Sequence, residues 1–240
     1  MNILLTGGSS GLGKAIVIAL SSFPENIIYF TFNKHKEEAD KIVQGKKNVY
    51  AIKCDFTISE DILELEKSIE TFDLDVLINN AYVGLPKDTY FHKTNPNSFL
   101  SSFENNVLPT IRITQQAIAG FRTKKFGKII NILTAYLVNI PPMGFSIYTA
   151  NKAYLQQLSK SWNSEYSRYN ITSNCISPEF MKTNFSSFVD ERVIEQMQSV
   201  HPLKKLLTCE EVAETVVFLV NSSQQINGAN IVINGAQNIL

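Results

Sequence analysis

The stretch that decides the fold is Thr6-Gly7-Gly8-Ser9-Ser10-Gly11-Leu12-Gly13. It follows a short apolar run at residues 3–5, which predicts a strand, and precedes residues 14–20, which predict a helix. Glycines at such a turn let backbone N–H groups approach a pyrophosphate, and the N-terminus of the helix adds a partial positive charge. Glycines can equally just form the turn between a strand and a helix, so the stretch alone leaves both interpretations open.

Strand and helix patterns alternate along the rest of the chain. Further β-rich runs lie at residues 26–32, 48–54, 76–78, 128–133, 171–176 and 229–234, and a helical pattern precedes each of them. Successive strand–helix–strand units form a parallel sheet with helices on both faces. The chain is therefore predicted to be an α/β protein with a doubly wound, seven-stranded parallel sheet.

Length and composition fit one globular domain. The 240 residues are 44% hydrophobic, and 22 basic residues balance 22 acidic ones, which argues against nucleic-acid binding through overall charge. Cys54, Cys175 and Cys209 lie far apart, so we expect reduced thiols and no metal site. The first apolar run begins at residue 3, which leaves no room for a signal peptide, and no run is long enough to cross a bilayer. We therefore expect a cytoplasmic protein without membrane partners.

A tyrosine and a lysine stand four residues apart in the helical pattern at residues 148–169. On a helix, Tyr148 and Lys152 share one face. A phenol titrates at about pH 10, and a neighbouring ammonium favours the phenolate and lowers that pKa. Such a pair can exchange a proton with a carbonyl or alcohol oxygen. The same spacing also occurs on ordinary amphipathic helices, so it indicates catalysis only together with other motifs.

Several motifs in a fixed order make the chain resemble the short-chain dehydrogenase/reductase family. Residues 6–13 match the family's TGxxxGxG turn, and residues 75–81 match its strand ending in NNAG. Tyr148 and Lys152 match its YxxxK pair, and Asp55 resembles the acid that holds the adenine amino group. The resemblance extends over nearly the whole chain and implies a hydride transfer between a nicotinamide cofactor and a substrate carbon.

The resemblance also implies a domain organisation. It predicts a single-domain Rossmann fold over residues 1–240, within which residues 179–207 form a substrate-binding loop and helix. Members of the family usually form dimers or tetramers through the helices that carry the catalytic residues and through the last strand. We therefore expect a homotetramer or a homodimer.

Catalytic roles follow from the resemblance in the same way. Tyr148 would be the general acid/base, Lys152 would lower its pKa and bind the nicotinamide ribose, and Asn106 would hold a water that links Lys152 to solvent. The family has a serine after the fifth strand, and Thr134 stands there in this chain. Threonine keeps the hydroxyl group that polarises the substrate oxygen. Ser146 is close in sequence but lies on the wrong side of the loop for that role.

The identity of the dinucleotide depends on the end of the second strand. Members that prefer NAD carry an acid there, whereas alignment places Phe32 at that position, followed by Lys34, His35 and Lys36. These cations would accept a 2′-phosphate and favour NADP(H), while Ser10, where many NADP enzymes have arginine, leaves NAD(H) open. The residues expected to bind the cofactor are Gly7, Ser9, Ser10, Gly11, Leu12, Gly13, Asn33, Lys34, Asp55, Phe56, Asn80, Ala81, Tyr148, Lys152, Pro178 and Thr183.

Two residues depart from the family pattern near the expected nicotinamide. Tyr82 replaces the glycine of NNAG, and Glu179 replaces the glycine of the Pro-Gly pair after the sixth strand. A tyrosine could narrow the pocket and a carboxylate could add a charge, or both could be tolerated surface variation. Together with Phe180 and Phe185, they are the residues expected to contact the substrate.

The chain looks most like the 3-oxoacyl-[acyl-carrier-protein] reductases within the family. Lys125 and Arg168 resemble the basic pair that docks the acidic carrier protein in those enzymes, although surface cations are usually just solvated. The expected function is therefore reduction of a carbonyl group with NADP(H), for example in a 3-oxoacyl thioester. A reductase or dehydrogenase of a sugar, a steroid-like or another small alcohol is an alternative, as is a dinucleotide-binding regulatory subunit with little catalysis.

Overall fold

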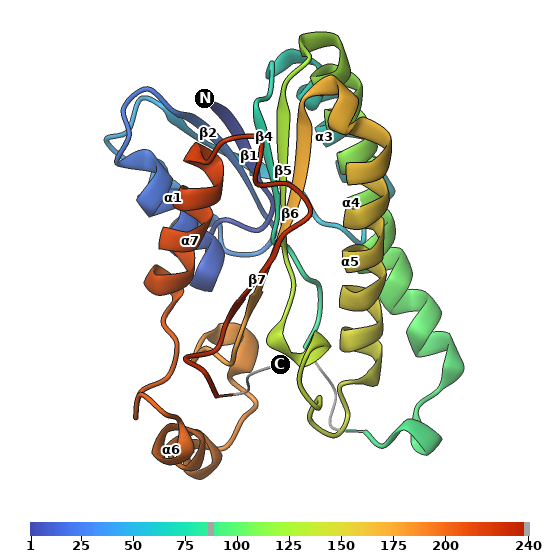
Figure 1. Cartoon of the computed structure of the whole chain (residues 1–240), viewed down its shortest axis with the longest axis vertical. Helices are drawn as coiled ribbons and strands as arrows, with labels where there is room; N and C mark the ends of the chain where they lie inside the picture. The colour runs from blue at the N-terminus through green and yellow to red at the C-terminus, as the bar shows by residue number, and fades with distance from the viewer. Residues whose placement is uncertain (86–88, 238–240) are drawn as a thin grey trace.

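The computed structural model describes residues 1–85 and 89–237 and shows one sheet between two helical layers (Figure 1). In these residues the sheet has seven parallel strands in the order β3-β2-β1-β4-β5-β6-β7. The predicted doubly wound α/β sheet is thus confirmed, and the strand order reverses between β1 and β4. The strands are β1 (Asn2–Leu5), β2 (Ile27–Phe32), β3 (Val49–Lys53), β4 (Val76–Asn79), β5 (Gly127–Ile132), β6 (Ile171–Pro178) and β7 (Asn230–Ile233).

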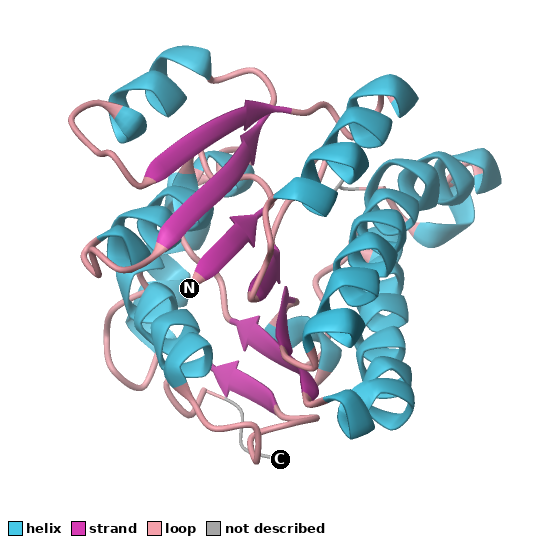
Figure 2. Ribbon diagram, turned by 90° about the horizontal axis from the view of Figure 1, so that it is seen from above, coloured by secondary structure: helices cyan, strands magenta, loops and turns pink. Residues whose placement is uncertain are grey.

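Helices cover both faces of the sheet, as the view along it shows (Figure 2). The helices are α1 (Gly11–Ser21), α2 (Lys36–Val43), α3 (Ser59–Thr71), α4 (Pro96–Lys124), α5 (Ser146–Tyr166), α6 (Glu191–Val200) and α7 (Cys209–Asn221). One apolar cluster joins α1, α2 and α7 to the sheet, and a second joins α3, α4 and α5 to the opposite face. Helix α6 lies beyond the carboxyl ends of the strands, at the bottom of Figure 1.

The short central strands are apolar on both faces because both faces are covered. In β1, the fully buried side chains of Ile3 and Leu5 belong to the first cluster, and Leu4 between them belongs to the second. Successive side chains of a strand point to opposite faces, so an unbroken apolar run is what a doubly covered strand requires. Burying one such side chain stabilises the fold by about 2 kcal/mol.

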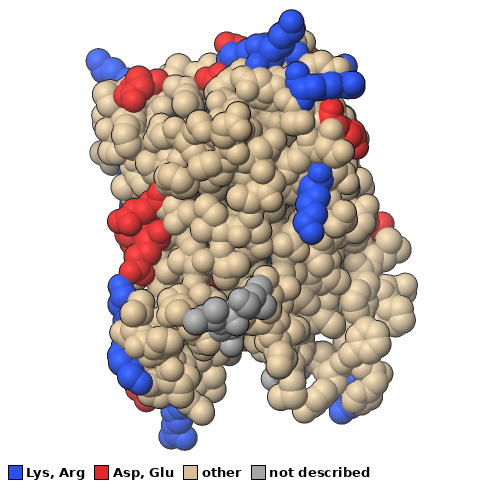
Figure 3. All heavy atoms as spheres, in the orientation of Figure 1, with Lys and Arg blue, Asp and Glu red and all other residues tan. Residues whose placement is uncertain are grey.

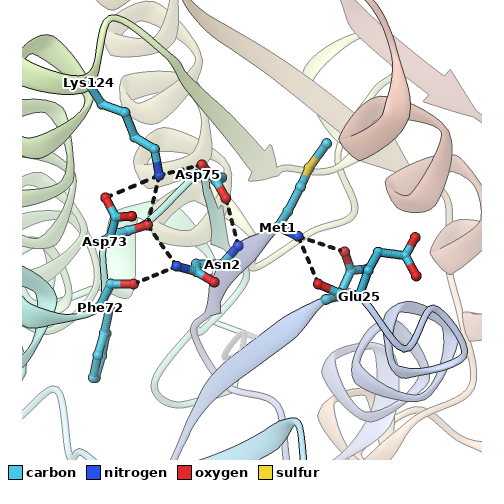
Figure 4. Close-up of polar contacts among 8 residues, drawn as sticks. Met1, Asn2, Glu25, Phe72, Asp73, Asp75 and Lys124 are labelled. Atoms are coloured by element: carbon cyan, nitrogen blue, oxygen red, sulfur yellow. Dashed lines mark hydrogen bonds and ion pairs between the residues drawn. The ribbon is translucent and has the colours of Figure 1, made fainter.

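A polar cluster fixes the amino ends of the strands (Figure 4). Lys124, at the end of α4, pairs with Asp75 at 2.6 Å and with Asp73 at 3.1 Å. Asp75 also accepts a hydrogen bond of 2.8 Å from the backbone N–H of Asn2, and the Asn2 side-chain amide donates to the carbonyl oxygens of Phe72 and Asp73. The cluster therefore ties β1, α4 and the start of β4 together at the edge opposite the glycine-rich turn.

Two further findings concern residues 1–85 and 89–237. None of their helices combines the length and the apolar character needed to cross a membrane. These residues also contain no group of three or more His, Cys, Asp or Glu side chains that could hold a metal ion. The three cysteines are free, and Cys54 and Cys175 are buried.

Candidate active site

The glycine-rich turn joins β1 to α1 and brings two stretches of backbone unusually close. Gly7 and Gly11 have positive φ angles of 73° and 47°, a region that favours glycine. A Cβ atom on Gly13 would lie 1.9 Å from the carbonyl oxygen of Gly7, and one on Gly8 would lie 2.6 Å from the side chain of Phe30. Positions 8 and 13 therefore have no room for a side chain. The turn leads directly into the N-terminus of α1, whose first N–H groups lack carbonyl partners within the helix.

Side chains from two neighbouring strands hold this turn in place. The Asn80 side-chain amide donates to the carbonyl oxygens of Thr6 and Gly7 at 2.9 and 3.0 Å, and the Thr6 hydroxyl accepts hydrogen bonds from the N–H groups of Asn80 and Ala81. From the other side, the Thr31 hydroxyl accepts a hydrogen bond of 2.9 Å from the N–H of Gly7. Sequence reasoning missed Thr31; a hydroxyl group inside the apolar run of β2 was the available signal.

A cavity of about 640 Å³ opens at the carboxyl ends of the strands. Its volume lies in the usual range for small-molecule sites. Every residue expected to bind the cofactor lines it, as do Thr134 and the four residues expected to contact the substrate. Asn106 is not among the described residues that line it. The space-filling view is notched at this end of the molecule (Figure 3).

The part of the cavity beyond the end of β2 combines a carboxylate with a cation. Burial acts to raise the pKa of Asp55, but hydrogen bonds from Thr57 and Asn33 and the nearby charge of Lys34 outweigh that effect. The pKa of Asp55 is therefore lowered from its usual value. The Lys34 side chain is exposed at the cavity wall. Phe32 also lines the cavity, but its side chain is buried in the apolar core. The residue aligned with the acid of NAD-preferring enzymes is thus a core residue here.

Tyr148 and Thr134 meet at the inner wall of the cavity. Thr134 follows β5 and is buried, and its hydroxyl accepts a hydrogen bond of 3.3 Å from the N–H of Tyr136. Tyr148 lines the cavity and is only partly exposed. This burial raises the pKa of Tyr148 above its usual value, and a hydrogen bond with the Thr134 side chain only partly opposes the rise. Thr134, rather than Ser146, is therefore the hydroxyl residue beside Tyr148.

Lys152 is buried one helical turn after Tyr148 on α5. Its Nζ donates a hydrogen bond of 2.7 Å to the carbonyl oxygen of Ile132 and lies 5.8 Å from the centre of the Tyr148 ring. Burial lowers the pKa of Lys152 to about 8. The resemblance implied that Lys152 lowers the pKa of Tyr148; in this structure burial dominates and the pKa of Tyr148 is raised instead.

The side chain of Asn106 holds the segment that follows β4. Its Oδ1 accepts a hydrogen bond of 2.6 Å from the N–H of Val83, and its Nδ2 donates to the carbonyl oxygens of Val83 and Ser102. The carbonyl oxygen of Asn106 accepts a hydrogen bond of 2.8 Å from the Thr110 hydroxyl. The Asn106 side chain is therefore engaged in fixing the backbone next to Tyr82.

Aromatic rings surround Tyr148. The Tyr82 ring lies edge-on to the Tyr148 ring, with 5.0 Å between centroids, and the Nζ of Lys152 lies 5.4 Å from the Tyr82 centroid. Phe185 packs 5.8 Å from both tyrosine rings, and Phe145 lies 6.0 Å from that of Tyr148. Sequence reasoning missed Phe145, which precedes α5. These rings give the wall around Tyr148 an apolar, planar character.

Glu179 and Phe180 follow β6 and line the same end of the cavity. The backbone N–H of Glu179 donates to the carbonyl oxygen of Ile233, so the end of β7 fixes its position. Its side chain is half-buried, and burial raises the pKa of its carboxyl group. Glu179 is therefore a carboxylate inside the cavity wall rather than a solvated surface acid.

Lys125 and Arg168 lie at the opposite edge of the sheet. Lys125 follows α4 in a left-handed conformation with φ of 53°, and Arg168, after α5, lies 5.0 Å from the centre of the Tyr169 ring. Basic side chains gather at this end of the surface, near the top of Figure 3. Both residues precede the strands β5 and β6, whereas the cavity lies where these strands end.

Comparison with known proteins agrees with this geometry. A family model described as "Enoyl-(Acyl carrier protein) reductase" matches residues 7–236. An acetoacetyl-CoA reductase from Shinella zoogloeoides is 30% identical over 98% of this chain and 97% of that protein. The 3-oxoacyl-[acyl-carrier-protein] reductase FabG from Rickettsia bellii is 30% identical over 97% of this chain and 94% of that protein.

A solved structure shows the same fold. A short chain dehydrogenase from Burkholderia cenocepacia J2315, determined in complex with NADP, superimposes with a TM-score of 0.85 and 24% identity, covering 99% of this chain and 98% of that one. The sheet order, the glycine-rich turn and the Tyr148–Lys152 pair thus occur in a chain whose whole length matches known reductases. The protein belongs to the short-chain dehydrogenase/reductase family and is an oxidoreductase.

Proposed function

We propose that the protein reduces a carbonyl group to an alcohol with NADP(H), and that Tyr148 provides the proton. The observation that carries this proposal is that one continuous cavity extends from the glycine-rich turn to the Tyr148–Thr134 pair. The backbone contact between Gly13 and Gly7, which a Cβ atom would prevent, fits the close approach of a pyrophosphate at a helix N-terminus. When bound, NADPH supplies the hydride.

The residues around Tyr148 account for the proton transfer. The phenol is protonated at neutral pH, and its raised pKa means that it gives up the proton only to an oxygen that becomes strongly basic. The carbonyl carbon gains the hydride, the electrons of the C=O double bond move to the oxygen, and that oxygen takes the proton from Tyr148 Oη. Thr134 would hydrogen-bond the same oxygen, and the Lys152 ammonium would stabilise the phenolate that remains.

Preference for NADP(H) is supported by the charge at the far end of the cavity. Lys34 is exposed at the cavity wall, where a 2′-phosphate would gain a charge-assisted hydrogen bond. The core residue Phe32 cannot supply the carboxylate that binds a ribose diol. The Burkholderia relative, which was solved with NADP, is consistent with this preference.

A 3-oxoacyl thioester is the first substrate we propose, because two relatives are named as reductases of such compounds. We further propose that an acyl carrier protein delivers this thioester by docking at Lys125 and Arg168. Because these residues lie at the edge of the sheet opposite the cavity, we expect Arg168→Glu to weaken turnover of the carrier-bound thioester and to leave a short free thioester unaffected. Equal rates for Arg168→Glu and the wild type on both substrates would contradict carrier docking here.

We also propose that the protein self-associates as a homotetramer or homodimer. Helices α4 and α5 expose Leu108 and Tyr154, which are 43% and 46% accessible, and such apolar side chains are suited to an interface between helices. Light scattering should give at least twice the mass of the chain. A monomer at all concentrations would refute this proposal.

The experiment that tests the function follows the loss of NADPH absorbance with acetoacetyl thioesters and simple ketones. We expect turnover with the wild type and a loss of about a hundred- to ten-thousandfold with Tyr148→Phe, at unchanged NADPH affinity. Tyr50→Phe, which removes the phenol oxygen of an exposed tyrosine of β3 outside the cavity, is the control and should retain full activity. Equal turnover by Tyr148→Phe and the wild type would overturn the assignment.

A further inference from the structure

A second cavity, of about 260 Å³, adjoins the first at Glu179. Tyr136, Glu179 and Phe180 line both cavities, so the two cavities meet at residues next to the candidate reaction centre. Asn139 and the buried His201 line the second cavity and not the first. A substrate whose carbonyl group reaches Tyr148 could therefore extend its other end past Glu179.

Two hydrogen-bond acceptors in this second cavity lack adequate donors. Within residues 1–85 and 89–237, the side-chain contact of the Glu179 carboxylate is one long hydrogen bond, 3.5 Å, from Asn139 Nδ2, and none of the ion pairs includes it. The other amide atom, Asn139 Oδ1, is buried and has no hydrogen-bond partner among the same residues. A carboxylate and an amide oxygen that the surrounding protein donors leave available can accept hydrogen bonds from a bound ligand.

The neighbouring groups strengthen the case for a ligand that donates. Burial, followed by the charge of Glu179, raises the pKa of Tyr136 to about 12. His201 already accepts a hydrogen bond of 3.1 Å from the N–H of Leu203 at its Nδ1. A second negative charge entering this cavity would meet Glu179 at short range, whereas an ammonium or hydroxyl group would give the two acceptors the donors they lack.

We propose that this second cavity binds the part of the substrate that extends past Glu179, and that this part carries hydrogen-bond donors and no negative charge. Glu179 and Asn139 are then the residues that set substrate choice. An amino group and a cluster of hydroxyl groups share this donor chemistry. The inference rests on the proposed carbonyl reduction and adds to it the polarity of the substrate.

Four ketones with the same aromatic body and different remote groups test the inference: 4-ethylacetophenone, 4-(hydroxymethyl)acetophenone, 4-(aminomethyl)acetophenone and 4-acetylbenzoate. Isothermal titration calorimetry measures their binding to the protein saturated with NADP⁺, a complex in which no reduction occurs. We expect the aminomethyl or the hydroxymethyl ketone to bind about tenfold more tightly than the ethyl ketone, and the benzoate to bind most weakly.

Variants identify the source of the selectivity. Glu179→Gln should remove the advantage of an aminomethyl group and keep much of that of a hydroxymethyl group, because an amide oxygen still accepts hydrogen bonds. Glu179→Gly, which restores the residue usual in the family, should remove both. Glu214→Gln is the matched control, because Glu214 is an exposed acid of α7 that lines neither cavity.

The possible failures are distinguishable. The inference would be overturned if the ethyl and donor-bearing ketones bound with equal affinity, or if none of the four ketones bound. It would also be overturned if both Glu179 variants kept the selectivity of the wild type. Ketones that bind with the expected selectivity but are never reduced by NADPH would instead overturn the proposed function. Reduction of the ethyl ketone as efficiently as the others would leave the proposed function standing and refute the role of Glu179.

Discussion

Replacing Lys152 with methionine should make the protein more stable while it abolishes activity. Lys152 Nζ is buried and donates to the carbonyl oxygen of Ile132. Its pKa falls from 10.5 to about 8, so the unfolded chain holds the proton more tightly than the folded one. At pH 7 this difference costs the folded state about 3 kcal/mol. Methionine has a similar length and no charge, and loss of the hydrogen bond offsets about 1 kcal/mol, which leaves a net gain of about 2 kcal/mol.

The pH dependence of the unfolding free energy tests this prediction independently. The cost of burying the Lys152 charge is fully present below pH 8 and disappears as the pH rises through the ordinary lysine value. At pH 9.5 the cost should be about 1 kcal/mol, so the advantage of Lys152→Met should vanish there. Urea unfolding at both pH values measures the difference in unfolding free energy, and NADPH-dependent reduction measures the activity.

Lys160→Met is the matched control for this experiment, because Lys160 is exposed on the same helix. It should change the unfolding free energy by less than about 0.5 kcal/mol at either pH. The reasoning would be refuted if Lys152→Met were less stable than the wild type at pH 7. It would also fail if a stabilisation at pH 7 persisted unchanged at pH 9.5.

Three further predictions concern other parts of the molecule. Lys128, a buried lysine of β5, donates to three carbonyl oxygens at the end of α7. Lys128→Met should therefore lower the unfolding free energy measured in urea by about 3 kcal/mol. An unchanged midpoint of urea unfolding would contradict this role. Gly13→Ala places a methyl group 1.9 Å from a backbone oxygen, so it should lower the unfolding free energy by about 2 kcal/mol and abolish the NADPH binding that fluorescence titration measures. Gly120→Ala, with open space around its Cβ, should be neutral or stabilising. Lys34→Glu should reduce the ratio of NADPH to NADH activity by about tenfold or more. Lys36 was expected beside the 2′-phosphate as well, but it does not line the cavity, so Lys36→Glu should leave the ratio unchanged.

Features that depend on local sequence were predictable. The alternation of apolar runs and helical patterns gave the doubly wound sheet because each pattern extends over only a few neighbouring residues. The close packing of Gly13 against Gly7 is built into one turn, and Tyr148 and Lys152 lie on one helix face at a spacing of four. The family resemblance then selected the residues that line one cavity.

Features that depend on contacts between distant segments were not predictable. Thr31 and Gly7 are far apart in the chain, and so are Val83 and Asn106. The direction of the Tyr148 pKa shift was also missed, because the spacing to a lysine is visible in the sequence but the burial that opposes it is not.

The central claim is that the protein transfers a hydride from NADPH to a carbonyl carbon while Tyr148 supplies the proton. The most direct measurement uses NADPH deuterated at the transferable position of the nicotinamide and an acetoacetyl thioester, with the product examined by mass spectrometry and NMR. We predict one deuterium on the carbon that bears the new hydroxyl group with the wild type, and no detectable product with Tyr148→Phe in the same time. Alcohol formed without deuterium at that carbon, or formed equally well by Tyr148→Phe, would contradict the account.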